Sequence, residues 1–485
     1  MNKIIIEKKL FQLWKELLNL NKFTSNQDFY VLGGSSFLAI QMLYLIKKEI
    51  GVELSPSNFL RKPLTINYLT KTLCAIPKKT VVKKLIRETF YQDLQNIKHC
   101  QFVWPSYKYK TINSIFLTGA SGFVGIHLVE SLLKNTDYTI YCLVHSSNIK
   151  LAWEKLESAV SFYKLSKLNC KRIKIIIGDL GQKNFGLKQL QYNDLANVVD
   201  VIIHAGAVVN FKMSYLDLKS VNIDGTKEII KFSSVFKSKP IHYISSLAVL
   251  GINHTKKVKN IYNENNSIKL KPNSAYAQTK FIAEKYIQFG IKSGMLGNIY
   301  RLGEIAPASD TGVPNQRALH HIFIEGCKTI KAYPQSSYKV DYLPVDFAAN
   351  FIVKTIALEN KKFIGKTFHL CHPTGVSFDK IFQLLTQRGL QAKSLDGLNF
   401  LRHLRQQSTN ILEVATLKLF IERQKSTKNY HHNIFQSFFL KEMDCISIKN
   451  TKDLMKITKQ TFPVIDDKML SPYISFFKTN HKIYD

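Results

Sequence analysis

The stretch SIFLTGASGFVGIHLVESLL, residues 114–133, decides the fold of this chain. A short apolar run ends in a glycine turn and an apolar helical pattern follows, which predicts a strand, a tight loop and a helix. Gly119 would allow the turn, Gly122 would let backbone N–H groups approach a pyrophosphate, and Gly125 would let the helix pack closely. Because strand and helix flank the glycines correctly, the stretch predicts a dinucleotide-binding loop rather than a structural turn.

Short apolar runs rich in Ile, Val and Tyr recur after this stretch. Longer helical patterns separate them, and this alternation predicts a Rossmann-type, doubly wound parallel sheet in an NAD(P)-binding domain at 111–375. Beyond residue 375 the alternation gives way to helical and irregular sequence, which predicts a smaller, mostly helical substrate-binding region at 376–485. The expected strands are TIYCLVH, IKIIIGDL, DVIIHAGA, PIHYISS and NIYRLG.

The N-terminal part has a different pattern of apolar residues. Residues 4–20 and 37–50 carry apolar residues at helical spacing, and two shorter helical pieces interrupted by prolines follow them. Strand–helix alternation is absent, so an all-α four-helix domain is predicted at 1–76. A linker with a lead-in helix is expected at 77–110.

Composition and charge narrow the classes of function. The 485 residues, 45% of them hydrophobic, suit two or three domains. Lys and Arg outnumber Asp and Glu by 68 to 35, a formal net charge of +33. The basic residues are nevertheless scattered and no nucleic-acid-binding motif is present, so compositional drift is the better explanation and no nucleic-acid partner is predicted. No uncharged apolar stretch is long enough to predict a membrane span.

Cysteine usage and the N-terminus bear on the compartment. The 7 cysteines form no C-x-x-C pair and no zinc-like spacing with histidine, so no metal site is predicted. They indicate reduced thiols of a cytoplasmic protein. The first residues, MNKIIIEKKLFQLW, interrupt their apolar run with charges, so they are not expected to be a secretory signal.

The end of the second expected strand bears on the choice of cofactor. An enzyme that uses NAD usually presents an acid there to the ribose 2′-hydroxyl. Here the strand ends in His145 and no acid follows directly. This favours NADPH, whose 2′-phosphate an acid would repel. The alternative for His145 is a histidine in a surface loop.

A serine, a tyrosine and a lysine form the candidate catalytic set. Tyr276 and Lys280 are four residues apart in SAYAQTKFIAEK and share one helical face. The ammonium of Lys280 would lower the pKa of Tyr276 and favour proton transfer, while Ser246, at a strand end, would hydrogen-bond the substrate oxygen. Together they would protonate an oxygen whose carbon receives a hydride. Y-x-x-x-K alone also occurs by chance in exposed helices; its place after the glycine loop favours catalysis.

The motifs TGASGFVG, GDL, HAGAVVN, VNIDGT, YISS and YAQTK resemble those of the extended short-chain dehydrogenase/reductases. DYLPVDFAA and FPVIDDKMLSPYISFF resemble one branch, the thioester reductase domains that end nonribosomal peptide synthetases and carboxylic acid reductases. The resemblance spans about 88–480 and implies that Tyr276 donates the proton, with Lys280 as its partner and Ser246 beside it. It implies cofactor contacts by Gly119, Ser121, Gly122, Phe123, Val124, Gly125, His145, Asp179, Leu180, Ala205, Asn222 and Lys280.

Two positions depart from this family pattern. His145 stands where the family usually has Arg. The family often has Arg-Pro-Gly after the sixth strand, where this chain has Arg301-Leu302-Gly303, so Leu302 replaces the proline. Leu302 is expected to alter the wall of the nicotinamide pocket. Arg301 and Arg317 are candidate substrate contacts.

The N-terminal stretch DFYVLGGSSFLAIQML, residues 28–43, resembles the core motif of peptidyl carrier domains. The resemblance covers about 5–75 and makes Ser36 the attachment point for 4′-phosphopantetheine, with Ser35 in place of the usual Asp or His. A helix N-terminus suits the phosphodiester, although Ser36 as a simple helix cap is the alternative. Basic residues outnumber acidic ones here, unlike in the usual acidic carriers.

These resemblances predict a carrier followed by an NADPH-dependent thioester reductase. An acyl or peptidyl thioester on the phosphopantetheine of Ser36 would be released as an aldehyde, or after a second reduction as an alcohol. No adenylation or condensation sequence is present, so the expected partners are an adenylating or synthetase enzyme that loads the carrier in trans and a phosphopantetheinyl transferase. The alternatives are an acyl-CoA reductase, a sugar-nucleotide epimerase or dehydratase, and a non-catalytic carrier with a cofactor-binding module.

Overall fold

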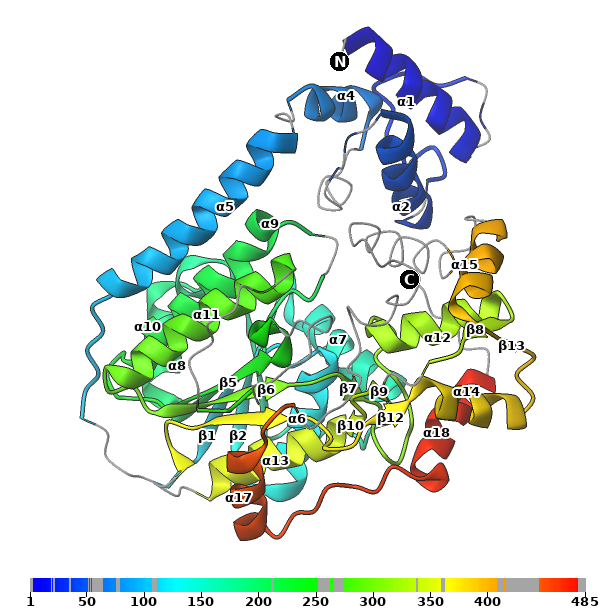
Figure 1. Ribbon diagram of the computed structural model, residues 1–485. Coiled ribbons are helices and arrows are strands. Elements are labelled where there is room, and N and C mark those ends of the chain that lie inside the picture. Colours follow the sequence, from blue (N-terminus) through cyan, green and yellow to red (C-terminus); the bar gives the residue numbers. More distant parts are fainter. Residues whose placement is uncertain are drawn as a thin grey trace. The chain divides into compact units, whose positions relative to one another are not determined.

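A strand–helix alternation begins at residue 114, after a run of helices, in the computed structural model of the protein (Figure 1). The chain divides into two units, Met1–Lys98 with Val209–Lys219, and His99–Val208 with Ser220–Asp485. The residues that the structure describes are 3–18, 20, 22–34, 36–50, 52, 54, 64–75, 79–106, 111–210, 213–251, 262–265, 272, 274–336, 339–358, 363–407, 414 and 445–478.

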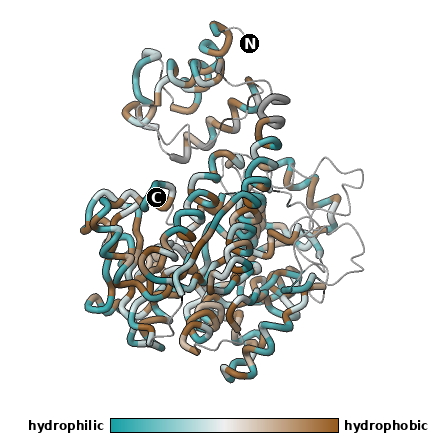
Figure 2. Tube along the Cα trace, turned by 90° about the vertical axis from the view of Figure 1, so that its left-hand side faces the viewer, coloured by the Kyte–Doolittle hydropathy of each residue, from teal (hydrophilic) through white to brown (hydrophobic). Residues whose placement is uncertain are grey.

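The N-terminal helices build a core of their own, in which Trp14 is fully buried. Its indole nitrogen lies 3.0 Å from Met42 Sδ, and its ring lies 5.1 Å from that of Phe29. Figure 2 shows apolar and hydrophilic residues mixed along this part of the chain. The predicted all-α domain is confirmed; Pro56 and Pro63 lie outside the described residues. The helical elements are α1 (Lys3–Leu18), α2 (Ser36–Leu45), the π-helical η1 (Ile46–Ile50) and α4 (Ile66–Ala75).

The lead-in helix α5 (Lys79–Asn96) belongs to the same unit as the short helix α9 (Tyr215–Lys219). The Asp93 carboxylate joins them: it accepts a hydrogen bond from the Tyr215 hydroxyl at 2.8 Å and pairs with Lys219 Nζ at 2.6 Å. The rings of Phe90 and Tyr215 lie 5.9 Å apart beside this contact. Because Asp93 is buried and both its oxygens are bound, this junction ties α5 firmly to α9.

The second unit is built on a seven-stranded sheet in the order β11-β6-β5-β4-β1-β2-β3. All neighbouring strands in it are parallel, so the predicted doubly wound sheet is confirmed. The strand order reverses at β1, and such sheets bind ligands outside the carboxyl ends of the strands at this switch point. The strands are β1 (Ser114–Thr118), β2 (Thr139–Val144), β3 (Ile173–Ile177), β4 (Val201–His204), β5 (Ile241–Ser246), β6 (Gly297–Leu302) and β11 (Thr367–Leu370).

Helices cover both faces of this sheet. The crossover from β1 to β2 and the crossover from β4 to β5 run in opposite directions along it, so their helices lie on opposite faces. On one face α6 packs on α13, and on the other α10 packs on α11 (Figure 1). The elements are α6 (Phe123–Asn135), α7 (Ile149–Phe162), η3 (Lys183–Gly186), α8 (Gln189–Val198), η4 (Ser220–Asp224), α10 (Gly225–Ser233), η5 (Leu247–Leu250), α11 (Ala275–Lys292) and α13 (Val345–Ala357).

The remaining elements surround a second core in this unit. Buried residues on both sides of position 375 share it, among them Ile324 and Tyr342 with Phe382 and Tyr473. Three two-stranded pairs rim it: β7 with β10, β8 with β13, and β9 with β12. The elements are β7 (Ile305–Ala306), α12 (Leu319–Thr329), β8 (Ala332–Pro334), β9 (Lys339–Val340), β10 (Leu343–Pro344), β12 (Val376–Ser377), α14 (Phe378–Gln387), β13 (Lys393–Leu395), α15 (Gly397–Gln406), α17 (Lys449–Thr458) and α18 (Asp467–Lys478).

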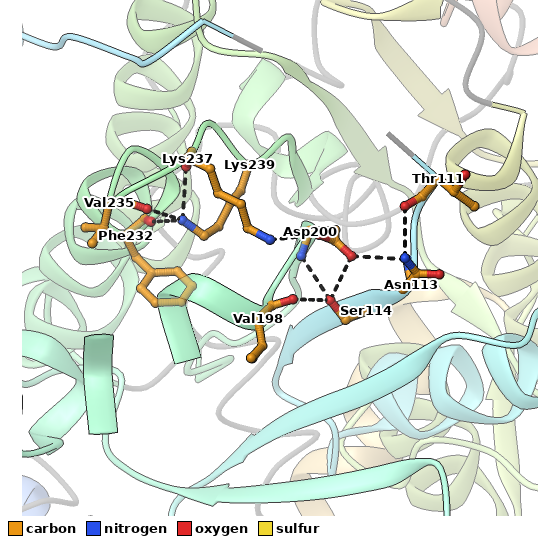
Figure 3. Close-up of polar contacts among 9 residues, drawn as sticks. All are labelled: Thr111, Asn113, Ser114, Val198, Asp200, Phe232, Val235, Lys237 and Lys239. Atoms are coloured by element: carbon orange, nitrogen blue, oxygen red, sulfur yellow. Dashed lines mark hydrogen bonds and ion pairs between the residues drawn. The ribbon is translucent and has the colours of Figure 1, made fainter. Parts of the chain in front are cut away.

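A fully buried lysine closes the C-terminus of α10, near the amino ends of the strands (Figure 3). Lys239 Nζ donates to the carbonyl oxygens of Phe232 at 3.3 Å, Val235 at 2.6 Å and Lys237 at 3.0 Å. A cation suits the negative end of a helix dipole. Beside it Lys237 pairs with Asp200 at 2.8 Å. These contacts fix the turn between α10 and β5.

None of the helices among the described residues is both long and apolar enough to cross a bilayer.

Candidate active site and carrier site

The glycine loop has the close packing that the sequence predicts. Gly119 adopts a left-handed backbone with φ of +76°, and a Cβ there would lie 2.8 Å from the Gly206 nitrogen. A Cβ on Gly125 would lie only 1.9 Å from the Gly119 carbonyl oxygen. Side chains at Gly119 and Gly125 would therefore push the loop off the sheet and the helix off the loop.

The N-terminus of α6 is open for an anion. Gly122 is its N-cap, so no side chain satisfies the first helical N–H groups, and Ser121 and Gly122 are exposed. The N–H groups of Phe123, Val124 and Gly125 lie in this first turn, where intrahelical partners are lacking. Backbone donors and a positive helix end at the switch point of the sheet fit a dinucleotide pyrophosphate.

A buried chain of side chains that the sequence reasoning missed ties the strand ends together below this loop. Thr118 Oγ1 lies 2.8 Å from His204 Nδ1, and His204 Nε2 lies 3.0 Å from Thr226 Oγ1. Thr226 donates its hydroxyl proton to the Asn222 carbonyl, so it accepts from His204 Nε2–H. Burial lowers the pKa of His204 to about 3, so the ring is neutral. The Gly206 N–H donates to Thr118 at 2.9 Å and completes the chain.

Asn222 links the loop after β4 to the helix that carries the tyrosine and the lysine. Its side chain exchanges two hydrogen bonds with the Val208 backbone, at 2.8 and 3.1 Å. Its amide also donates to Thr279 Oγ1 on α11 at 3.0 Å. Asn222, a predicted cofactor residue, therefore lies at the carboxyl edge of the sheet and holds α11 against it.

Three other predicted cofactor residues lie at this edge. Asp179, after β3, accepts from the Gly181 N–H at 2.9 Å and from Gln182 Nε2 at 3.2 Å, which shapes its loop. Leu180 is buried, and a Cβ on Gly206 would lie 3.0 Å from its side chain. Ala205 precedes Gly206 in the loop after β4 and is half-buried.

His145 is exposed beyond the end of β2, and the structure places a cation beside it. Lys155, on α7, donates to the His145 carbonyl oxygen at 2.5 Å. Asn148 caps α7 by accepting from the Leu151 N–H at 2.9 Å, which orients the helix past the strand end. The sequence analysis missed Lys155, although a lysine two turns into the helix after this strand was a usable signal.

Ser246 and Tyr276 come together at the carboxyl end of β5. Ser246 is the last residue of the strand, and its side chain hydrogen-bonds with Tyr276, which is 9% exposed. Ser246 Oγ also accepts from the Ala248 N–H at 3.2 Å. Burial raises the pKa of Tyr276 to about 12. The predicted lowering of this pKa by Lys280 was wrong in direction for the protein alone, because desolvation of the phenolate dominates.

Lys280 lies one helical turn further along α11 and is 3% exposed. Its Nζ donates to the Ile244 carbonyl oxygen at 2.7 Å and lies 4.2 Å from the centre of the Tyr243 ring. Burial lowers the pKa of Lys280 to about 7, against the opposing effect of the Glu284 carboxylate. The lysine is therefore poised to change protonation near neutral pH.

The two arginines considered as substrate contacts differ in accessibility. Arg301 is fully buried and pairs with Glu284 at 2.6 Å, so its prediction as a substrate contact was wrong. Arg317 is exposed. Leu302 pairs in register with Ser246 and is buried. A Cβ on Gly303 would lie 1.6 Å from Asp341 Oδ2, so a glycine is required at this strand end.

The carrier loop is shaped by one carboxylate and two glycines. Asp28 accepts from the Tyr30 N–H at 2.8 Å and from the Leu64 N–H at 2.7 Å. Gly33 has φ of +95°, and a Cβ on Gly34 would lie 2.3 Å from the Phe29 ring. The loop is thereby fixed directly before α2.

Ser36 is the first residue of α2, at the predicted helix N-terminus. Ser35, the variable position of the motif, lies outside the described residues. The described part of the chain contains no group of three or more His, Cys, Asp and Glu side chains able to hold a metal ion.

Comparisons with known proteins match both parts of the chain. Residues 117–352 match an NAD-binding family described as male sterility protein, and residues 8–69 match the phosphopantetheine attachment site family. A linear gramicidin synthase protein of Brevibacillus parabrevis is 31% identical over 394 residues, which cover 80% of this chain and 8% of that protein. The chain spans between 8% and 39% of the length of the curated relatives it matches.

Two solved structures share the fold. The terminal R domain from the myxalamid PKS-NRPS biosynthetic pathway is 25% identical with a TM-score of 0.70, covering 80% of this chain and 97% of that one. A thiolation-reductase di-domain from an archaeal non-ribosomal peptide synthetase is 20% identical with a TM-score of 0.65. The likeness to the di-domain covers 98% of this chain and 97% of that one, so it extends over both units.

Proposed function

We propose that this chain, which joins a phosphopantetheine-attachment domain to an NAD-binding domain of the male sterility protein family, reduces an acyl or peptidyl thioester to an aldehyde. The observation that carries the proposal is the meeting of Ser246 with Tyr276 and Lys280 at the carboxyl edge of the sheet. An attachment domain in the same chain would provide the thioester that such a site reduces. The similarity to the linear gramicidin synthase protein and to the terminal R domain supports this proposal.

The chemistry asks three things of these side chains. Bound NADPH supplies a hydride to the thioester carbon, and negative charge develops on the carbonyl oxygen. Ser246 and Tyr276 would hydrogen-bond this oxygen and stabilise its charge. A pKa of about 12 keeps Tyr276 protonated at neutral pH, so its proton is available to the oxygen. Protonated Lys280 would stabilise the phenolate that this transfer leaves behind.

The balance of atoms gives the products. One hydride and one proton are added, the C–S bond breaks, and the proton ends on the sulfur. The products are an aldehyde and a free thiol. A second hydride and proton would convert the aldehyde to an alcohol.

We propose NADPH as the preferred cofactor. The glycine loop fits a pyrophosphate, and the end of β2 presents His145 and Lys155 where an NAD enzyme has an acid. A lysine ammonium attracts a 2′-phosphate as a point charge. Lys155 would thus bind the 2′-phosphate in place of the arginine that the family usually has at the end of this strand.

We propose Ser36 as the attachment point of 4′-phosphopantetheine. It begins a ten-residue helix behind the loop that Asp28 fixes, within the region that matches the attachment-site family. A phosphopantetheinyl transferase would modify it, and a separate synthetase would load it, in a cytoplasmic setting. The proposed domains are 1–76 for the carrier, 77–110 for the linker, 111–375 for cofactor binding and 376–485 for the substrate.

Two measurements test the proposal. Intact-mass analysis after incubation with coenzyme A and a phosphopantetheinyl transferase should show one added arm on wild type and none on Ser36→Ala. NADPH oxidation with an acyl-pantetheine thioester should fall by about 10²–10⁴-fold in Tyr276→Phe. An equal mass gain in Ser36→Ala would refute the attachment point, and a full rate in Tyr276→Phe would refute the proton donor.

A further inference from the structure

Three side chains of α11, spaced by four residues, contact the last three residues of β5. Tyr276 bonds Ser246, Lys280 bonds the Ile244 carbonyl, and Glu284 bonds Ser245. Residues four apart on a helix lie on one face, so the three contacts form a single row. The first two belong to the proposed catalytic set. The third has no place in the chemistry described so far.

Glu284 is fully buried and held from two strands. Ser245 Oγ donates to its Oε2 at 2.5 Å. Arg301, on the neighbouring strand β6, donates through Nε at 3.0 Å and through Nη2 at 2.6 Å, both to Oε1. Ser245 and Arg301 stand opposite each other in the sheet register. The carboxylate therefore binds the ends of β5 and β6 to α11 directly beneath Ser246.

Arg301 is in turn fixed from the next strand. Its Nη1 lies 3.0 Å from His369 Nε2 on β11. Because arginine only donates, His369 accepts through Nε2 and donates through Nδ1 to the Ser447 carbonyl at 2.9 Å. Burial lowers the pKa of His369 to about 3, in agreement with a neutral ring. Arg301 is thus bound from two sides, by Glu284 and by His369.

We propose that Glu284 is a positioning residue for the reaction: through Ser245 and Arg301 it sets the separation of β5 and α11 at which Ser246, Tyr276 and Lys280 act together. The inference rests on the proposed thioester reduction and assigns to Glu284 no contact with the substrate. A buried ion pair is a poor way to stabilise a fold, since desolvation offsets much of the attraction. The hydrogen bonds of this ion pair do, however, join β5, β6 and α11 at the Glu284 carboxylate.

The same carboxylate acts electrostatically on Lys280. Among the residues that the structure describes, the titratable groups that face Lys280 are Tyr276 and Glu284 on its own helix, Tyr243 on β5 and His204 on β4. Glu284 raises the pKa of Lys280, which burial lowers. Activity that needs protonated Lys280 falls as the pH rises through this pKa. Removal of the carboxylate should therefore move the alkaline limb of the rate profile to lower pH.

Two variants of the full-length protein separate position from charge. Ser245→Ala removes the tie to β5 but keeps the carboxylate, whereas Glu284→Gln removes the charge. With NADPH and an acyl-pantetheine thioester, we expect Ser245→Ala to lower kcat by at least about tenfold with an unmoved pH profile. We expect Glu284→Gln to lower kcat and shift the alkaline limb down by about one pH unit. Neither should change KM for NADPH more than about twofold.

Matched controls keep the test decisive if Glu284→Gln does not fold. Ser245→Thr keeps the hydroxyl and should restore most of kcat. Ser131→Ala removes a similarly buried hydroxyl, bonded to Asn350 Oδ1 at 2.7 Å, and should keep the wild-type rate. Full kcat in Ser245→Ala, beside an active wild type, would overturn the positioning role. Failure of wild type to oxidise NADPH with the thioester would overturn the proposed function and this inference with it.

Discussion

Two buried lysines of the second unit have similar electrostatics and lie at opposite ends of the sheet strands. Lys280 and Lys239 are 3% and 0% exposed, and burial lowers the pKa of each to about 7. Each lies over an aromatic ring, at 4.2 Å from Tyr243 and 5.1 Å from Phe232 respectively. By perturbed pKa alone, both would be candidates for catalysis.

Their surroundings separate them. Lys239 gives its donors to three carbonyls near the end of α10, near the amino ends of the strands (Figure 3). Lys280 gives one donor to the Ile244 carbonyl and stands one turn from Tyr276 at the carboxyl end of β5. A parallel sheet binds its ligands at the carboxyl ends, so we expect a functional role for Lys280 and a structural one for Lys239.

Lys280→Met should have the largest effect. In the proposed mechanism the ammonium would stabilise the Tyr276 phenolate, so we expect its loss to lower kcat for thioester reduction by about 10²–10⁴-fold. The measurement is NADPH oxidation with an acyl-pantetheine thioester, with thermal unfolding as a check on folding. A decrease in kcat of less than about threefold would contradict a catalytic role for Lys280.

Lys239→Met should instead lower the free energy of unfolding. The substitution deprives the carbonyls at the end of α10 of their donor, which should cost about 1–3 kcal/mol. Denaturant unfolding measures the cost, and kcat with the same thioester should stay at the wild-type value. A large fall in kcat for a folded Lys239→Met protein would show that Lys239 also contributes to catalysis, although it lies near the amino ends of the strands.

Lys155→Glu tests whether an exposed lysine at the carboxyl edge is functional. A carboxylate at this position should repel the 2′-phosphate, so we expect KM for NADPH to rise by about tenfold or more. KM for NADH should change little, since NADH lacks that phosphate. An equal change for both cofactors would place Lys155 outside the phosphate site.

The pH dependence of stability tests the charge state of Lys239. The folded pKa of Lys239, about 7, lies below the unfolded value of about 10.4, so the unfolded state binds more protons between these pH values. The free energy of unfolding then rises with pH in this window. The stability difference between wild type and Lys239→Met should therefore be larger at pH 9 than at pH 6.5. A constant difference would mean that the three carbonyls keep Lys239 charged.

Much of the architecture could be read from local sequence. The stretch 114–133 forms β1, the glycine loop and α6, because its apolar spacing and its glycines act within a few residues. The α1 pattern likewise places Leu10 and Trp14 on one buried face. The edge at which a cofactor would bind could also be predicted, because all strands of a parallel sheet have their carboxyl ends at the same edge. Asn222 and Tyr276 lie at this edge as expected.

Contacts between distant segments were out of reach of such reasoning. The sequence offers Arg301 as a candidate substrate contact, and only the folded structure shows that it is fully buried and paired with Glu284. The expected shift of the Tyr276 pKa had the wrong sign because the sequence shows a neighbouring lysine but not the loss of water. His204 and Thr118 are 86 residues apart, so no local pattern joins them.

The sequence by itself determined the order of the elements, the glycine turn and the residues that could do chemistry, since these depend on backbone conformation and spacing along the chain. The tertiary structure decided which charged groups lose water and which find partners. Lys280 and Lys239 show why: their pKa values depend on burial, and their roles depend on the strand end at which the fold leaves them.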